Sequence, residues 1–95
     1  MMPDQWPSEV IYKYALRDEH CAGYHDLPIG AQIVHVGLQG GGLYLWIKPT
    51  TDPAAPKELR SFWLVGTGQE FPAGMTFVGT YFNGAYVWHV LEATA

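Results

Sequence analysis

Short runs of β-branched and aromatic residues, each ended by glycine or proline, constrain the fold of this chain most strongly. Such runs favour strands, whereas glycine and proline favour turns. No stretch of ten or more residues shows the spacing of an amphipathic helix. We therefore expect an all-β fold, either a small antiparallel barrel or a curled sandwich of about six strands with mainly meander connections. The expected strands cover residues 9–16, 31–39, 43–48, 59–66, 75–82 and 85–91.

Two glycine-containing motifs predict tight hairpin turns. Gly40, Gly41 and Gly42 permit positive φ, and the pair Asn83-Gly84 is the strongest short hairpin signal in the chain. Longer segments that are polar or contain proline and glycine are expected to be loops. These loops cover residues 17–28, 49–56 and 67–73.

The length of 95 residues predicts one domain. Residues 1–8 lack periodicity and are expected to be a flexible N-terminal segment before a single β domain over 9–95. The start of the chain has no signal-peptide pattern and no apolar run is long enough to cross a bilayer. With Cys21 as its only cysteine, the chain cannot form an internal disulfide, which fits a reducing cytoplasm.

Both faces of the predicted strands carry apolar or aromatic residues. In residues 43–48, one face holds Leu43, Leu45 and Ile47 and the other holds Tyr44, Trp46 and Lys48. In residues 85–91, the two faces are Ala85, Val87, His89, Leu91 and Tyr86, Trp88, Val90. A sheet with one face in water alternates more cleanly between apolar and polar residues. The second face is therefore expected to meet a ligand or a partner subunit.

Charge excludes one class of partner. The formal net charge is −4, from nine acidic and five basic residues. The bases form no patch of the kind that DNA-binding proteins use, so we expect no DNA binding. One or two cations still suffice to hold a small anionic ligand. The basic residues are Lys13, Arg17, Lys48, Lys57 and Arg60.

The sequence shows no catalytic or metal-binding motif. His20, Cys21 and His25 share one loop, but no second cysteine completes a zinc site, and a polar loop is the preferred interpretation. His35 and His89 lie in predicted strands and could face each other across a sheet, where a structural role is the more common one. No carboxylate pair is suitably placed for general acid–base chemistry. We therefore predict that the protein is not an enzyme and holds no metal and no cofactor.

Aromatic residues with interleaved cations give the best indication of a ligand. Bases stack on aromatic rings without sequence preference, and Lys13, Lys48 and Arg60 alternate with such rings along the strands. Residues 66–68 (Gly-Thr-Gly) lack the remaining features of a dinucleotide fingerprint, but their backbone could form an anion-binding nest rather than a simple tight turn. The strand aromatics are Tyr12, Tyr14, Tyr44, Trp46, Phe62, Trp63, Tyr81, Tyr86 and Trp88.

A set of short motifs, taken in order, resembles a family of short phage and prophage proteins long without assigned function. The motifs are Ile11-Tyr12-Lys13-Tyr14, Leu45-Trp46, Val65-Gly66-Thr67-Gly68, Val78-Gly79-Thr80 and Val87-Trp88-His89-Val90-Leu91-Glu92. The pattern is also similar to the anti-CBASS sponge proteins, which sequester cyclic dinucleotide alarm signals as oligomers. That resemblance implies binding of a cyclic nucleotide second messenger without cleavage, by a homo-oligomer, favoured as a tetramer, in the host bacterial cytoplasm.

The hypothesis assigns roles to seven residues. Tyr14, Trp46 and Trp88 would stack on bases, Lys13 and Arg60 would hold phosphates with help from Thr67, and His89 would bond a base edge or a phosphate. Two alternatives remain open. One is a small oligomeric protein-binding module that blocks a host protein, and the other is a nucleotide-cleaving enzyme.

Overall fold

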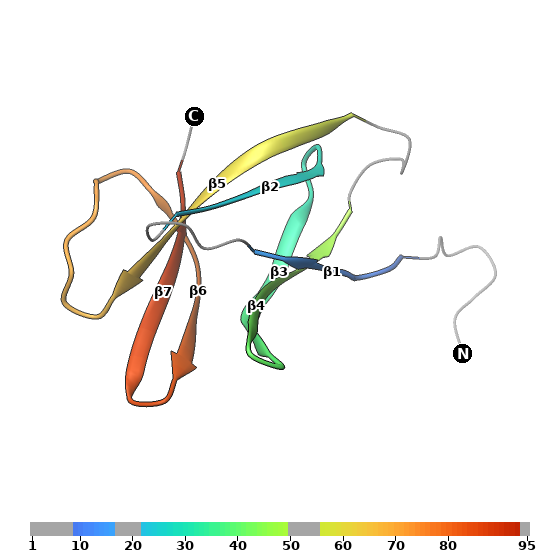
Figure 1. Cartoon of the computed structure of the whole chain (residues 1–95). Coiled ribbons are helices and arrows are strands. Elements are labelled where there is room, and N and C mark those ends of the chain that lie inside the picture. Colours follow the sequence, from blue (N-terminus) through green and yellow to red (C-terminus); the bar gives the residue numbers. More distant parts are fainter. Residues whose placement is uncertain (1–8, 17–21, 50–55, 94–95) are drawn as a thin grey trace.

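The computed structural model describes residues 9–16, 22–49 and 56–93, which form seven strands (Figure 1). No helix occurs among these residues, and hence none that could span a membrane. The predicted flexible segment 1–8 and the loop residues His20 and Cys21 lie outside the described residues. The strands are β1 (Tyr12–Ala15), β2 (Ala22–Pro28), β3 (Gln32–Gln39), β4 (Gly42–Lys48), β5 (Lys57–Gly66), β6 (Thr76–Asn83) and β7 (Tyr86–Glu92).

The strands form two antiparallel sheets that do not close into a barrel. One sheet has the order β1-β4-β3 and the other has the order β2-β5-β7-β6. The prediction of an all-β sandwich is therefore confirmed. Mainly meander connections were the wrong expectation, because only β3–β4 and β6–β7 pair with their neighbours in sequence. The ten residues of β5 instead pair with β2 on one side and with β7 on the other.

The segment expected to be a loop at residues 17–28 contains a strand. All seven residues of β2 pair with β5, from Ala22 opposite Trp63 to Pro28 opposite Lys57. An edge strand tolerates glycine and proline, because one side of its backbone makes no ladder hydrogen bonds. Because β2 contains Gly23 and Pro28, its residue types do not predict a strand.

Both predicted hairpins are present, and Figure 1 shows their tips pointing in the same direction. Gly40 and Gly41 form the two-residue loop between β3 and β4, with φ angles of 58° and 84°. In the second hairpin Asn83 is still paired with Tyr86, so the loop is Gly84-Ala85, one residue later than expected. The positive φ at both glycine loops is the conformation that primed hairpin turns require.

The core lies between the two sheets. The predicted alternation is clear along β4, where Leu45 and Ile47 are fully buried on the inner face. In β7 the neighbours Val90 and Leu91 are both buried, so both faces of this strand are covered near its end. Contacts between the sheets run mainly from β3 to β6, and Gly79 of β6 lies directly against Val36 of β3. A Cβ atom built there would lie 2.6 Å from Cγ1 of Val36. The core cluster comprises Leu16, Leu27, Ala31, Val36, Leu45, Ile47, Phe62, Leu64, Tyr81 and Val90.

Candidate ligand-binding surfaces

Three rings form a platform on the outer face of the three-stranded sheet. Trp46 lies in the central strand β4, directly opposite His35 of β3, and their ring centroids are 5.3 Å apart. Tyr44 is two residues before Trp46 on the same face, at a centroid distance of 6.1 Å. We call His35, Tyr44 and Trp46 the aromatic platform. Because β1 and β3 flank β4, the platform spans the middle of the sheet.

Lys13 adds a positive charge to the aromatic platform. It is the β1 partner of Trp46, and its ammonium group lies 4.6 Å from the centroid of the Tyr44 ring. The same Nζ donates a hydrogen bond to Oε1 of Gln39 on β3, at 2.7 Å. The side chain of Lys13 therefore reaches across β4, and its charge is held over a ring by a cation–π contact.

Local sequence explains why these rings face outward. Leu45 and Ile47 are fully buried on the opposite face of β4, and alternation then places Tyr44 and Trp46 outside. Glycine makes room for two of the rings. A Cβ atom at Gly37 would lie 3.0 Å from Nε2 of His35, and one at Gly42 would lie 3.0 Å from Cε2 of Tyr44. The His35 and Tyr44 rings therefore lie against the backbone of their own sheet.

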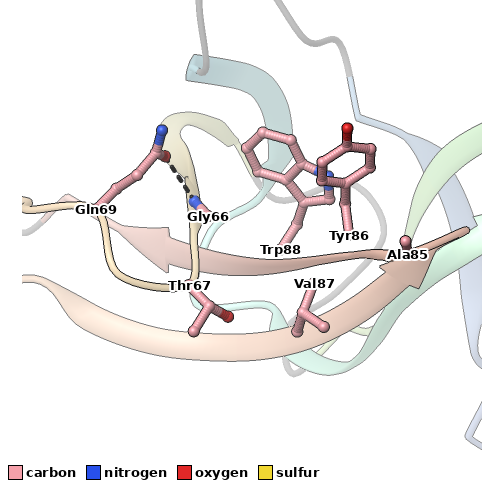
Figure 2. Close-up of a pocket in the computed structure, with 7 residues that line it drawn as sticks. All are labelled: Gly66, Thr67, Gln69, Ala85, Tyr86, Val87 and Trp88. Atoms are coloured by element: carbon pink, nitrogen blue, oxygen red, sulfur yellow. Dashed lines mark hydrogen bonds between the residues drawn. The ribbon is translucent and has the colours of Figure 1, made fainter.

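A second surface is a groove of about 450 Å³ beside the turn that follows β5 (Figure 2). Tyr86 and Trp88 rise from β7 on the same side, whereas Thr67 and Val87 point to the opposite side. The Oε1 atom of Gln69 accepts a hydrogen bond from the backbone amide of Gly66 at 2.7 Å. The residues that line the groove are Gly66, Thr67, Gln69, Ala85, Tyr86, Val87 and Trp88.

His89 connects the turn after β5 to strand β6. Its Nε2 atom lies 2.8 Å from Oγ1 of Thr67, and its Nδ1 atom lies 2.9 Å from Oγ1 of Thr80. Both ring nitrogens thus have a hydroxyl partner on the outer face of the four-stranded sheet. His35 belongs to the other sheet, so the expectation that His35 and His89 face each other across one sheet is wrong.

The backbone of residues 66–69 donates most of its hydrogen bonds within the protein. The Gly66 amide donates to the side chain of Gln69, the Thr67 amide to the carbonyl oxygen of Val87, and the Gln69 amide to the carbonyl oxygen of Gly66. These three groups hold the turn in place. The hydrogen bonds of these three amides are therefore those of a tight turn, as one of the two interpretations predicted. An anion would have to displace Gln69 before it could bind the Gly66 amide.

Arg60 makes a structural ion pair in the interior of one edge of the sandwich. Its Nε and Nη2 atoms donate to the two carboxylate oxygens of Glu92, the latter at 2.7 Å, and Nη1 donates to the carbonyl oxygen of Ala31 at 2.6 Å. The hydrogen-bonded carboxylate of Glu92 raises the pKa of Arg60 above its ordinary value. The guanidinium group thus joins the end of β7 to the residue before β3.

Comparison with known proteins assigns a family. A family model described as a domain of unknown function, DUF7352, matches residues 7–95. The chain belongs to the DUF7352 family. The resemblance to a family without assigned function is confirmed at this level. Neither the curated proteins nor the solved structures contain a match to this DUF7352 domain.

The predicted site residues of the DUF7352 domain separate into distinct places. Lys13 and Trp46 lie together at the aromatic platform. Thr67 and His89 bond each other, while Trp88 occupies the groove beside them. The two remaining residues lie elsewhere: Arg60 is engaged by Glu92, and Tyr14 is paired with Leu45 and packs against the core.

Sequence reasoning missed part of each surface. His35, Tyr44 and Gln39 at the platform, and Gln69 and Tyr86 at the groove, were not among the predicted ligand residues. For Tyr44 and Tyr86 the signal was present, because they alternate with Trp46 and Trp88 on the same strands. Gln39 and Gln69 became visible only once the fold brought them near Lys13 and Gly66.

Proposed function

We propose that this DUF7352 domain binds a nucleotide on the aromatic platform and holds it without cleaving it. One observation carries the proposal: Lys13 lies opposite Trp46 on one outer sheet face, beside the rings of His35 and Tyr44. A nucleotide presents a flat base and an anionic phosphate. A ring platform with an adjoining ammonium group matches both parts.

In this proposal the aromatic rings bind the base by stacking, and Lys13 binds the phosphate by its charge. Stacking of a base on an aromatic side chain contributes about 1–3 kcal/mol and tolerates any base. Trp46 is the central ring, so a base placed over it also contacts His35 or Tyr44. Lys13 then exchanges its hydrogen bond to the neutral Gln39 amide for a bond to a phosphate oxygen, in which donor and acceptor carry opposite charges. Sheet faces bearing aromatic residues serve single-stranded nucleic acids in the same way.

The resemblance to phage sponge proteins supports a finer version of this proposal. In that version the ligand is a cyclic nucleotide alarm signal, and the domain acts as a homo-oligomer, favoured as a tetramer, in the bacterial cytoplasm. Phe77 and Phe82, exposed on the outer face of the four-stranded sheet, offer apolar surface for such an assembly. A sponge acts by holding its ligand, so the proposal includes no catalytic residue.

Isothermal titration with a panel of cyclic dinucleotides and trinucleotides tests the proposal. Trp46→Ala should weaken binding about tenfold, which corresponds to about 1.4 kcal/mol. Lys13→Gln should weaken binding and reduce its dependence on salt. Matched controls are Trp63→Ala, on the outer face of the other sheet, and Lys57→Gln, whose side chain is exposed. Absence of binding by the wild-type protein, or equal binding by Trp46→Ala, would overturn the proposal.

Chromatography separates a sponge from a nucleotide-cleaving enzyme. The protein is incubated with its ligand and then denatured by heat, and the released nucleotide is analysed. A sponge returns the intact ligand in full, however long the incubation. Steady conversion to a linear or smaller nucleotide would identify an enzyme instead.

The protein-binding module remains the second candidate because of one observation. Leu59 and Phe82 are each 70% exposed and Phe77 is 62% exposed, which is a large apolar area for so small a domain. A protein partner on this face would use neither Lys13 nor Trp46. Replacement of Phe77 and Phe82 by serine should then abolish binding of the partner protein, whereas Trp46→Ala and Lys13→Gln should retain that binding.

A further inference from the structure

We propose that the groove beside the turn after β5 is a second ligand site, which takes an uncharged, hydroxylated ring such as a neutral sugar. Its walls are Tyr86 and Trp88, and its polar edge is Gln69 (Figure 2). None of these residues belongs to the aromatic platform. The inference is therefore independent of the proposed nucleotide site.

The two rings of the groove differ in exposure: Trp88 is held against the core, whereas Tyr86 is open to solvent. Tyr86 and Trp88 are two residues apart on β7, so both side chains stand on the same face, as Figure 2 shows. Trp88 is partly buried and packs against the core, which fixes its ring. Tyr86 is 71% exposed and free to contact a ligand. Flat carbon–hydrogen faces of sugar rings pack well on aromatic surfaces of this kind.

Gln69 presents hydrogen-bond donors at the edge of the groove. Because its Oε1 atom accepts from the Gly66 amide, the amide nitrogen is turned away from the backbone. Within the part of the chain that the structure describes, neither this nitrogen nor the hydroxyl of Tyr86 has a hydrogen-bond partner. A side-chain amide offers two donors, and a phenol both donates and accepts. Sugar hydroxyl groups can satisfy all of these groups.

The absence of charge decides the class of ligand. No acidic or basic side chain occurs among the seven described residues that line the groove. A phosphate placed here would find no cation, whereas Lys13 provides one at the aromatic platform. A volume of about 450 Å³ lies within the usual range for small-molecule sites, roughly 300–1,000 Å³. Apolar walls with a few polar groups are typical of such sites.

NMR titration of the full chain tests this inference. Glucose, galactose, N-acetylglucosamine, maltose and lactose are each added up to about 20 mM, well above the dissociation constant of roughly 1 mM that marks a weak site. At least one sugar should shift the Trp88 indole and the Tyr86 ring signals in a saturable way. If no sugar does so, the inference is wrong.

Variants of exposed residues give the test a matched control. Tyr86→Ala should weaken sugar binding at least about fivefold, whereas Tyr86→Phe, which keeps the ring, should weaken it only about twofold. Tyr12→Ala is the control, because Tyr12 is also an exposed tyrosine, at 47%, but does not line the groove. Equal loss in Tyr12→Ala and Tyr86→Ala, or no loss in Tyr86→Ala, would overturn the assignment.

Two further measurements separate this site from the proposed nucleotide site. Trp46→Ala and Lys13→Gln should bind the sugar as the wild-type protein does, whatever their effect on nucleotides. A nucleotide that displaces the sugar from Tyr86 and Trp88 in the Lys13→Gln variant would contradict an uncharged ligand. Failure of the nucleotide proposal alone leaves the sugar titration unaffected.

Discussion

The side chain of Val36 fills the space that a side chain at position 79 would occupy. The two residues belong to different sheets, Val36 to β3 and Gly79 to β6, which are the strands through which the sheets mainly contact each other. The register of β6 against β7 shifts between Phe77 and Gly79, so a bulge immediately precedes the contact. The absence of a side chain at position 79 therefore allows β6 to pack closely against Val36 at this point.

Gly79→Ala should destabilise the domain by about 1–3 kcal/mol, because the added methyl group meets Val36 Cγ1 in a packed core. Chemical denaturation measures the loss. In a Val36→Ala background the same substitution should cost at least about 1 kcal/mol less, since the obstructing methyl groups are gone. An equal cost in both backgrounds would show that the Val36 contact is not the cause.

Arg60→Met should lower the free energy of unfolding by about 2 kcal/mol, because it leaves the largely buried carboxylate of Glu92 without its partner. The double variant with Glu92→Gln should recover part of the loss. The pKa of Arg60 is raised in the folded protein. The contribution of the charged Arg60 to the free energy of unfolding is therefore complete below the pKa of arginine in the unfolded chain. It is lost only as the pH rises through the higher pKa of Arg60 in the folded protein. Urea denaturation at pH 7 and pH 9 should give the same difference, whereas a smaller difference at pH 9 would contradict this account.

Thr67→Ala should release the turn after β5, because it removes the hydroxyl that bonds Nε2 of His89. We expect a loss of about 1 kcal/mol and faster amide hydrogen exchange at residues 67–69. Thr76→Ala serves as a control, since Thr76 is exposed at the start of β6. Unchanged exchange in Thr67→Ala would mean that the backbone hydrogen bonds and the Gln69 side chain hold the turn without the Thr67–His89 bond.

The glycines of the first hairpin should respond differently to substitution. A Cβ atom at Gly40 or Gly41 meets nothing within 4 Å, so only backbone conformation matters. Gly40→Asn should be neutral or stabilising by up to about 0.5 kcal/mol, because Asn-Gly is a preferred pair in such turns. Gly41→Ala should cost about 1 kcal/mol, because φ is 84° there. Thermal unfolding of both variants compares the two effects directly.

The sequence allowed the fold class to be predicted because side-chain alternation survives in the central strands. In β4 the inward residues Leu43, Leu45 and Ile47 are apolar, and in β7 Trp88 and Val90 pack against the same core. The pairing of distant strands was not predictable, since nothing in Lys57–Gly66 indicates that β2 and β7 flank it. β2 itself was missed because its pairing depends on the backbone of β5, while its composition includes Gly23 and Pro28.

The candidate sites were predictable only where they follow a single strand. Trp46 and Trp88 were identified as aromatic residues of strands, and their neighbours Tyr44 and Tyr86 share that pattern. The structural role of Arg60 could not be predicted from its charge, because its partner Glu92 lies 32 residues later in the sequence. In the same way, Gln39 reaches Lys13 only after β1 and β3 have both paired with β4.

The shortness of β1 has a consequence for the behaviour of this protein at high concentration. β1 is a sheet edge of four residues, and Lys13 is one of its two central positions. Short, lysine-bearing edges resist the addition of a strand from another molecule. Replacing Lys13 with an apolar residue would thus leave the edge open to aggregation, in addition to any effect on a ligand. Glutamine is the better choice for binding studies, because the loss of affinity is then not confused with a loss of soluble protein.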